Sequence, residues 1–332
     1  MGLTRRGATV ARVTFARAVA EALAEEMRRD ETVILLGEDV RTGILGTTKG
    51  LVEEFGPGRV LDTPISEAGF AGLAVGAAAA GLRPVVDLMY GQFTYLAMDQ
   101  LANQAAKLRY MTGGQVRLPV TYLFVSGGGH RGAAQHSESP HGMVMNVPGL
   151  KVVVPGTGPD AKGLLKASIR DDNPVLFYMD FQLLRTRWDV PEGEYTAPLG
   201  QAEVKREGTD VTVVAVGGMV PKALAAAAAL AEQGISVEVV DPRCLAPLDV
   251  ETVVASVRKT RRLVVADDAP PRAGAAAEIV AAVAEAALDA LVCPPRRVTR
   301  PPAPVPFNAS LEDAALPSQE VLERTVAEVA RR

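Results

Sequence analysis

The sequence is poor in cysteine and histidine and has no long uncharged stretch. Its two cysteines, Cys244 and Cys293, are far apart and have neither a C-x-x-C pair nor a neighbouring histidine. A disulfide framework and the usual spacing of a zinc site are therefore excluded. The longest uncharged run, 68–82, covers fifteen residues, fewer than the roughly 20 that span a bilayer. We expect a protein of a reducing compartment with no membrane segment.

An excess of charge of one sign is also lacking. The chain has 35 Lys and Arg against 39 Asp and Glu, a net charge of -4, so it shows no basic excess typical of nucleic-acid binding. Arg5, Arg6, Arg12 and Arg17 precede the first acid, Glu21, a bias that transit peptides share. The segment has no apolar signal-peptide core, and a helical pattern begins inside it. We therefore expect a cytoplasmic protein.

Motifs of three common site classes are absent or incomplete. No G-x-S-x-G occurs, which argues against a hydrolase with a nucleophile elbow. Gly69, Gly72 and Gly76 are spaced G-x-x-G-x-x-x-G within a helical pattern, whereas a dinucleotide site needs G-x-G-x-x-G directly after a strand. A Rossmann-type dehydrogenase is thus poorly supported. The segment HRGAAQHSESPH has the ligand spacing of neither a helical nor a finger-type zinc site.

Apolar periodicity predicts alternating helices and strands along most of the chain. The first helix begins after Thr14, a good N-cap, and repeats Val19, Leu23 and Met27 at every fourth position. Further helices are predicted over 67–80, 95–111, 160–170, 221–233, 249–259 and 273–288. Buried strands are predicted at TVILLG, PVVDLM, VTYLFV, KVVV, VLFYM, VTVVAV, SVEVV and RLVVAD. Strands that alternate with such helices indicate α/β domains with parallel sheets covered on both faces.

One segment, DVPEGEYTAPLG, interrupts this pattern with Pro, Gly and polar residues, which favours a linker. We therefore expect two α/β domains, 1–190 and 202–332, joined by a linker at 191–201. A chain of 332 residues is long enough for two such domains. The two halves are not similar enough to indicate an internal duplication.

All three histidines, His130, His136 and His141, fall in one Gly-rich segment after the strand VTYLFV. Histidine is the side chain that titrates near neutral pH, so this segment is a candidate for proton chemistry. Loop histidines are also often solvated or structural, and spacing alone does not separate the two interpretations.

Several longer segments occur in a fixed order: DTPISEAGFAGLAVGAAAAGLRPV, DLMYGQFTYLAMDQLANQAAKLRYMTGG, AAQHSESP, VPGLKVVVP, DPRCLAPLD and VPFNASLEDAALPS. Through them the chain resembles, over nearly its full length, the β subunit of the thiamine diphosphate-dependent E1 component of 2-oxo acid dehydrogenase complexes. That family includes pyruvate, branched-chain 2-oxo acid and acetoin dehydrogenases. The resemblance implies a thiamine diphosphate pyrimidine-binding domain followed by a transketolase C-terminal-like domain.

The resemblance also implies roles for individual residues. Glu67 matches the glutamate that exchanges a proton with N1′ of the aminopyrimidine, a general acid–base step in cofactor activation. Met89 and Phe93 match residues that pack against the pyrimidine. His136 matches the histidine expected near thiazolium C2, which handles protons or stabilises charge during decarboxylation and acyl transfer. Glu38 is implied in a carboxylate relay between the two cofactor sites of the assembly.

Without the resemblance these residues have simpler explanations. Glu67 would be an acid stabilised by a helix N-terminus, Phe93 a core residue at a strand end, and Glu38 a solvated acid. His130 and His141 receive no role from the resemblance and stay loop residues.

The resemblance implies one possible cation site. Some relatives bind K⁺ through backbone carbonyl and side-chain oxygens, and the matching positions here are Val120, Ser168, Ile169, Asp171 and Asn173. This chain departs from the family at other positions. Glu138 stands where the family often has Gln, Met179 follows the strand where many members have Glu, and LVCPP lacks the carboxylate that holds E2 in some relatives.

One expected motif is missing from the chain. Thiamine enzymes bind the diphosphate and Mg²⁺ through a motif that begins with GDG, and no GDG occurs here. The resemblance therefore implies that an α subunit holds the diphosphate and Mg²⁺, in an α2β2 heterotetramer that decarboxylates a 2-oxo acid, pyruvate or branched-chain, and acylates lipoyl-E2. The alternatives are an acetoin dehydrogenase E1 β subunit and a non-catalytic scaffold of the same fold.

Overall fold

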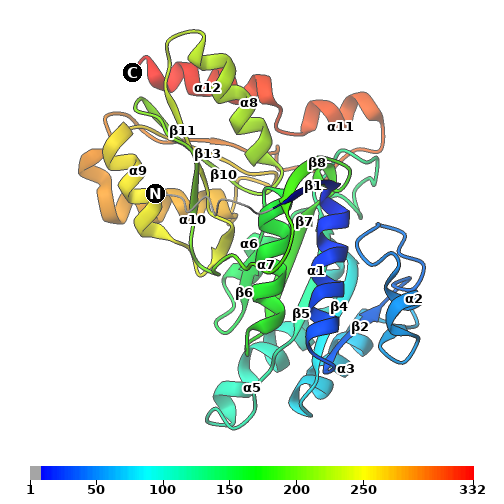
Figure 1. Ribbon diagram of the computed structural model, residues 1–332. Helices are drawn as coiled ribbons and strands as arrows, with labels where there is room; N and C mark the ends of the chain where they lie inside the picture. The colour runs from blue at the N-terminus through cyan, green and yellow to red at the C-terminus, as the bar shows by residue number, and fades with distance from the viewer. Residues whose placement is uncertain (1–8) are drawn as a thin grey trace.

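The structure, a computed structural model, describes residues 9–332. Residues 1–8, with Arg5 and Arg6 of the arginine-rich segment, lie outside the described residues. The chain forms two α/β domains, the first in the lower half of Figure 1 and the second in the upper half. None of the helices in the described part of the chain has both the length and the hydrophobicity that a membrane crossing needs.

The first domain is built on a seven-stranded sheet. Its strands, in spatial order, are β12 (Cys244–Ala246), β6 (Lys151–Val153), β7 (Val175–Asp180), β5 (Thr121–Ser126), β4 (Arg83–Tyr90), β2 (Val33–Gly37) and β3 (Val60–Asp62). All neighbours pair in parallel except β12 and β6. A separate antiparallel pair joins β1 (Val10–Thr14) to β8 (Arg187–Pro191).

Helices cover both faces of this sheet. One face packs against α1 (Phe15–Arg29) and α7 (Gly158–Arg170). The other packs against α3 (Glu67–Ala79), α4 (Thr94–Asp99), the π-helical segment η2 (Gln100–Ala105), α5 (Ala106–Met111) and α6 (His141–Met145). The remaining short elements are α2 (Leu51–Phe55) and the 3-10 turns η1 (Gly91–Phe93) and η3 (Phe181–Leu183).

The second domain has a five-stranded sheet. In spatial order it runs β14 (Arg296–Val298), β13 (Leu263–Ala266), β10 (Val211–Ala215), β11 (Val237–Asp241) and β9 (Glu203–Arg206), and only β9 is antiparallel. One face packs against α8 (Met219–Ala231) and α12 (Gln319–Ala330), and the other against α9 (Val250–Thr260) and α10 (Ala275–Ala287) with η4 (Leu288–Ala290). Helix α11 (Ala309–Ala315) extends toward the first domain (Figure 1).

The predicted α/β class and the parallel sheets are confirmed, but several elements differ from the prediction. The short strands β3 and β14 and the helices α2, α6, α11 and α12 were not predicted. The antiparallel strands β1, β8, β9 and β12 were not predicted from apolar periodicity. Strand β12 belongs by sequence to the second half of the chain but pairs with β6 of the first sheet. The predicted helix 95–111 is interrupted by the π-helical segment η2. Between β8 and β9, residues 192–202 form no helix or strand.

The first helix shows how local signals set an element. Thr14 Oγ1 accepts a hydrogen bond from the N–H of Arg17 at 3.2 Å, which satisfies a free donor of the first turn. Arg28 and Arg29 occupy the last turn, where cations suit the helix dipole.

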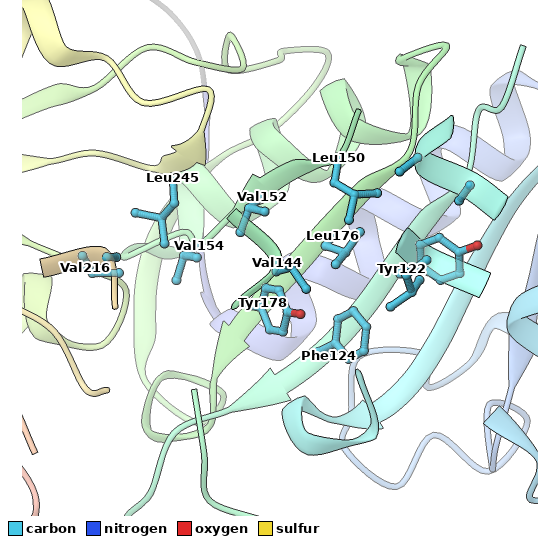
Figure 2. Close-up of a cluster of buried hydrophobic side chains, with 14 of the residues drawn as sticks. Tyr122, Phe124, Val144, Leu150, Val152, Val154, Leu176, Tyr178, Val216 and Leu245 are labelled. Carbon is cyan, nitrogen blue, oxygen red and sulfur yellow. The ribbon is translucent and has the colours of Figure 1, made fainter. Parts of the chain in front are cut away.

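One apolar core is shared by the two domains. Figure 2 shows Val216 of the second domain beside Leu245 of β12 and Val154 of the first domain. The same cluster continues through Leu176 to Tyr122 in the sheet of the first domain. Because these side chains form one buried cluster, the domains are held as one body. Cys244, which is buried, and Cys293 are free cysteines.

A buried carboxylate links α1 to α7 on the opposite face. Glu26 is fully buried and accepts hydrogen bonds from Arg170 Nη2 at 2.5 Å and from Arg29 Nε at 2.9 Å. A buried carboxylate is stable only with such partners. The ion pair of Glu26 with Arg170 therefore fixes how α1 and α7 pack against each other.

Replacing Arg170 should destabilise the protein more than replacing Glu26 itself. Arg170→Leu leaves a buried carboxylate with one partner, at a cost of about 3–5 kcal/mol in unfolding free energy. Glu26→Leu frees two arginines whose side chains are already 29% and 44% exposed, so the loss should be about 1–2 kcal/mol. Urea unfolding followed by circular dichroism measures both. Equal losses, or the reverse order, would contradict this account.

Candidate active site

The predicted site residues gather at the edge of the first sheet where its parallel strands end. Glu38 follows β2, Met89 and Tyr90 end β4, and residues 127–141, which we call the histidine loop, follow β5. The carboxyl ends of neighbouring parallel strands meet at one edge of a sheet, where ligands of α/β proteins bind. The fold therefore brings together segments that are far apart in the sequence.

Two of the predicted residues are acids that influence each other electrostatically. Glu67 is the first residue of α3 and is only 7% exposed. Glu38 Oε1 is buried and has no hydrogen-bond partner among the described residues. Burial, with the negative charges of Glu67, Asp39 and Asp87 adding to it, raises the pKa of Glu38 to about 7.

A third acid, the buried Asp87 of β4, adds its negative charge near Glu38. Burial raises the pKa of Asp87 to about 6, and a hydrogen bond from the N–H of Met89, at 2.9 Å, opposes the rise. Met89 has a left-handed backbone, with φ of 60°, a strained conformation for this residue type. Gly37 permits the close approach of β2, because a Cβ there would lie 2.2 Å from the carbonyl oxygen of Asp87.

The second group of site residues is aromatic. The ring of His136 lies 4.6 Å from that of Tyr90 and 5.6 Å from that of Phe93, both edge-on, measured between ring centroids. Tyr90 and Phe93 contact each other at 5.8 Å. The predicted pair of Phe93 and His136 is thus brought together, and Tyr90 packs against both.

A buried amide shapes the turn that carries His136. The side-chain oxygen of Gln92, in the orientation that satisfies its neighbours, accepts from the N–H groups of Glu138 at 2.7 Å, Ser137 at 2.9 Å and His136 at 3.2 Å. Three backbone donors are thereby satisfied by one side chain. Gln92 therefore fixes the backbone conformation of residues 136–138 and with it the position of the His136 ring.

The three histidines have different surroundings. His136 is partly exposed at the site. His130 stacks on Phe181 with 3.9 Å between ring centroids, and burial lowers its pKa. His141 is 2% exposed, and its Nε2 lies 3.2 Å from a carboxylate oxygen of Asp267 in the second domain. His130 and His141 are thus packed into the protein, not solvated.

Two positions that depart from the family have plain structural roles. Glu138 accepts a hydrogen bond from the hydroxyl of Tyr95 at 2.8 Å, and burial together with this contact raises the pKa of Tyr95 to about 12. Met179 is fully buried in the core beneath α1 and α7. Residues from Glu138 onward also line a cleft of about 1110 Å³ between the domains, opposite Leu245 and Ala273.

The residues suggested for K⁺ lie around the loop between α7 and β7. The backbone carbonyls of Ile169 and Asp171 converge on a cationic group of the protein, Arg83 Nη1, at 3.0 and 3.2 Å. Their geometry thus suits a positive charge, and Arg83 already supplies one.

The other three suggested ligands also have partners within the protein. The carbonyl of Val120 accepts from the N–H of Val175 at 2.9 Å, and the carbonyl of Ser168 accepts from the N–H of Asp171 at 3.2 Å. The side-chain oxygen of Asn173 accepts from Arg109 at 2.6 Å. Each carbonyl oxygen has a second lone pair, so these contacts leave room for a further ligand.

Sequence reasoning missed Asp87, Tyr90 and Gln92 as site residues. All three lie in or directly after the predicted strand PVVDLM. The available signal was an acid within an apolar strand, followed by an aromatic residue and an amide at its carboxyl end, where α/β sites form.

The chain is similar to known proteins over most of its length. It matches the transketolase pyrimidine binding domain over residues 11–187 and the transketolase C-terminal domain over residues 200–322. It is 48% identical to the acetoin:2,6-dichlorophenolindophenol oxidoreductase subunit beta of Bacillus subtilis, covering 93% of this chain and 94% of that one. It is 44% identical to the pyruvate dehydrogenase E1 component subunit beta of Bacillus subtilis, covering 95% and 98%.

A solved structure shows the same fold. A split gene transketolase, described as an inactive beta4 tetramer, superposes with a TM-score of 0.77 at 24% identity, covering 98% of this chain and 99% of that one. The resemblance found in the sequence is thus confirmed by both family matches and by close relatives. The chain belongs to the E1 β-subunit family, whose members join a transketolase pyrimidine-binding domain to a transketolase C-terminal domain.

Proposed function

We propose that this chain, together with an α subunit, catalyses the thiamine diphosphate-dependent oxidative decarboxylation of a 2-oxo acid, pyruvate or a branched-chain acid. The reaction breaks the C1–C2 bond of the substrate, releases CO₂ and reduces the lipoyl disulfide of E2 to a thiol and an acyl thioester. One observation carries the proposal. Two electrostatically coupled acids, the half-buried Glu38 and the buried Glu67, and an aromatic cluster around His136 share one edge of the sheet.

The residues present fit the pyrimidine half of thiamine diphosphate. When bound, this cofactor supplies the nucleophilic carbon that attacks the 2-oxo acid. Glu67 would hold and exchange the proton at N1′, and Met89 and Phe93 would contact the ring. Among the described residues Glu38 Oε1 has no hydrogen-bond partner, so the acid cluster has unused hydrogen-bonding capacity, which supports the proposal. Mg²⁺ and the diphosphate would be held mainly by the α subunit, because this chain has no GDG.

Glu38 is suited to a proton relay. An acid whose pKa lies at about 7 gains and loses a proton readily at neutral pH. Among the charges that raise the pKa of Glu38, that of Glu67 has the largest effect, so the protonation states of the two acids are coupled. We propose that Glu38 passes protons between Glu67 and the second cofactor site of the assembly.

An exposed apolar face favours an α2β2 heterotetramer. Ile65, Leu73 and Leu96 are more than half exposed on or beside α3 and α4, and α3 carries no charged residue after Glu67. Apolar surface of this kind marks protein contacts. We propose that this face is covered by the other E1 subunits. Lipoylated E2 would be a further partner. We also propose that the protein is cytoplasmic.

Two further assignments belong to this proposal. K⁺ would be held by oxygens of Val120, Ser168, Ile169, Asp171 and Asn173 through the second lone pairs of the backbone carbonyls, with Arg83 at Ile169 and Asp171 as a competing positive charge. The second candidate function is that of an acetoin dehydrogenase E1 β subunit, favoured by the relative at 48% identity that is named an acetoin oxidoreductase subunit. Turnover of pyruvate, branched-chain 2-oxo acids and acetoin by the reconstituted enzyme, with an artificial electron acceptor, separates these candidates.

Glu67→Gln should prevent activation of the cofactor while the fold is retained. A neutral amide cannot cycle a proton at N1′, so C2 hydrogen–deuterium exchange of bound thiamine diphosphate should slow by about 100-fold to 10,000-fold. The measurement uses the reconstituted α2β2 enzyme. Glu53→Gln, which changes an exposed acid of α2, is the matched control. An unchanged exchange rate in the Glu67 variant would remove the assigned role.

His136→Ala should impair decarboxylation or acyl transfer far more than cofactor binding. Its ring lies in the aromatic cluster, and loss of a general acid or base typically costs about 100-fold or more in rate. Single-turnover decarboxylation and lipoamide acylation are compared with cofactor affinity, with the exposed neighbour Gln135→Ala as control. Lost affinity with both chemical steps intact would mean that His136 anchors the cofactor instead.

The chain alone should bind thiamine diphosphate with Mg²⁺ weakly and show no decarboxylation. It lacks the GDG motif that would bring metal-binding oxygens to the diphosphate. Addition of the cognate α subunit should restore both properties. Calorimetric titration of the cofactor, with an artificial-acceptor assay on the same samples, tests this. Tight binding and turnover by the β chain alone would refute the two-subunit proposal.

A further inference from the structure

Several hydrogen bonds of the histidine loop are made with the second domain. Gly129 and Arg131 both have left-handed backbones, with φ of 93° and 63°, and their N–H groups point to the same carboxylate. Glu312 accepts from Gly129 at 2.8 Å and from Arg131 at 3.2 Å. Backbone N–H groups arranged in this way form a concave anion site.

The acceptor is a buried acid in α11. The side chain of Glu312 is fully buried, and it also pairs with the guanidinium of Arg131. Burial raises the pKa of Glu312, but the hydrogen bonds from Gly129 and Arg131 outweigh it, so the pKa lies below its ordinary value. The carboxylate is therefore held in its charged form.

The next residue on the helix offers a comparison. Asp313 pairs with the same guanidinium, Arg131 Nη1, at 2.7 Å, but its side chain is 63% exposed. Its hydrogen bonds go to the guanidinium of Arg131. Exposed ion pairs contribute little. Asp313 therefore has the same negative charge as Glu312 but holds the loop much more weakly.

A second contact holds the loop on the other side of His136. Arg300 Nη1 donates to the carbonyl of Ser137 at 2.6 Å, and Arg300 Nη2 donates to the carbonyl of Asp268 at 3.1 Å. Asp268 Oδ2 in turn accepts from the N–H of Gly128 at 3.1 Å. His136 thus lies between two attachments to the second domain, one at Arg131 and one at Ser137.

We propose that Glu312 is a positioning residue for His136, through which the second domain sets the geometry of the active site. The proposal rests on the proposed function of His136. Arg131 and Ala133 have positive φ angles, 63° and 57°, and such strained residues persist only where surrounding contacts hold them. The buried carboxylate supplies that contact for Arg131.

The histidines themselves provide the test. All three lie in the histidine loop, so a full chain labelled at histidine Cε1 gives three NMR signals that report on this loop alone. Glu312→Gln keeps the size of the side chain but turns an amide N–H₂ toward donors. The signals of His130 and His136 should shift, and the pKa of His130 should fall, because the charge of Glu312 raises it.

His141 is the internal reference, since Asp267 holds it. Its signal should stay in place in Glu312→Gln, and Asp313→Asn should leave all three signals unchanged. Loss of the His141 signal as well would mean that the variant has unfolded. In that case Glu312→Asp is measured instead of Glu312→Gln, and it should shift the signals of His130 and His136 by less. Wild-type signals of His130 and His136 in a folded Glu312 variant would overturn the proposal.

Activity is measured on the same variants in the α2β2 enzyme. Misplacement of a group by about 1 Å costs roughly 100-fold in rate, so kcat should fall to this extent in Glu312→Gln with little change in KM or cofactor affinity. Asp313→Asn should retain wild-type kcat. Shifted signals with unchanged kcat would support the attachment by Glu312 and count against the role of His136, so the two failures are distinguishable.

Discussion

The site depends on a shortage of hydrogen-bond acceptors in one loop. A Gly-rich segment after β5 exposes backbone N–H groups that its own sheet does not pair, and buried donors must be satisfied. Gln92 accepts three of them from within the first domain, while Asp268 and Glu312 accept others from the second. The two domains also share an apolar core. The two domains are therefore held together, and the loop between them is attached to both.

Local sequence signals were enough to predict most of the fold. Thr14 caps α1 as expected, and continuous apolar runs such as TVILLG became parallel strands, because a strand buried on both faces needs no alternation. Strand β12 could not be predicted, since its pairing with β6 is decided by residues about ninety positions away. The π-helical segment η2 was also missed, since its apolar pattern differs little from that of an α-helix.

The candidate site was predictable to a different degree. Glu67, Phe93 and His136 were found through segments that resemble a family, and the structure brings Phe93 and His136 into contact. Glu312 carries no local signal for its contact, because it lies 183 positions from Gly129 and looks like an ordinary helix acid in the sequence. Only the packing of the two domains turns it into a partner of the histidine loop.

Two remaining features of the site, the cluster of acids and the exposed apolar surface of α3, concern the contact of this chain with another subunit. Glu38 and Asp87 are acids whose pKa values are raised by burial. Such groups cost stability, and proteins usually retain them at functional sites. Beside them, α3 exposes Leu73 and other apolar surface to water. A partner that covers α3 would remove this surface from solvent and lower the dielectric around the acids, which strengthens their coupling. Formation of the proposed subunit interface would thus bury the exposed face and strengthen the coupling through which a proton is proposed to pass between the acids.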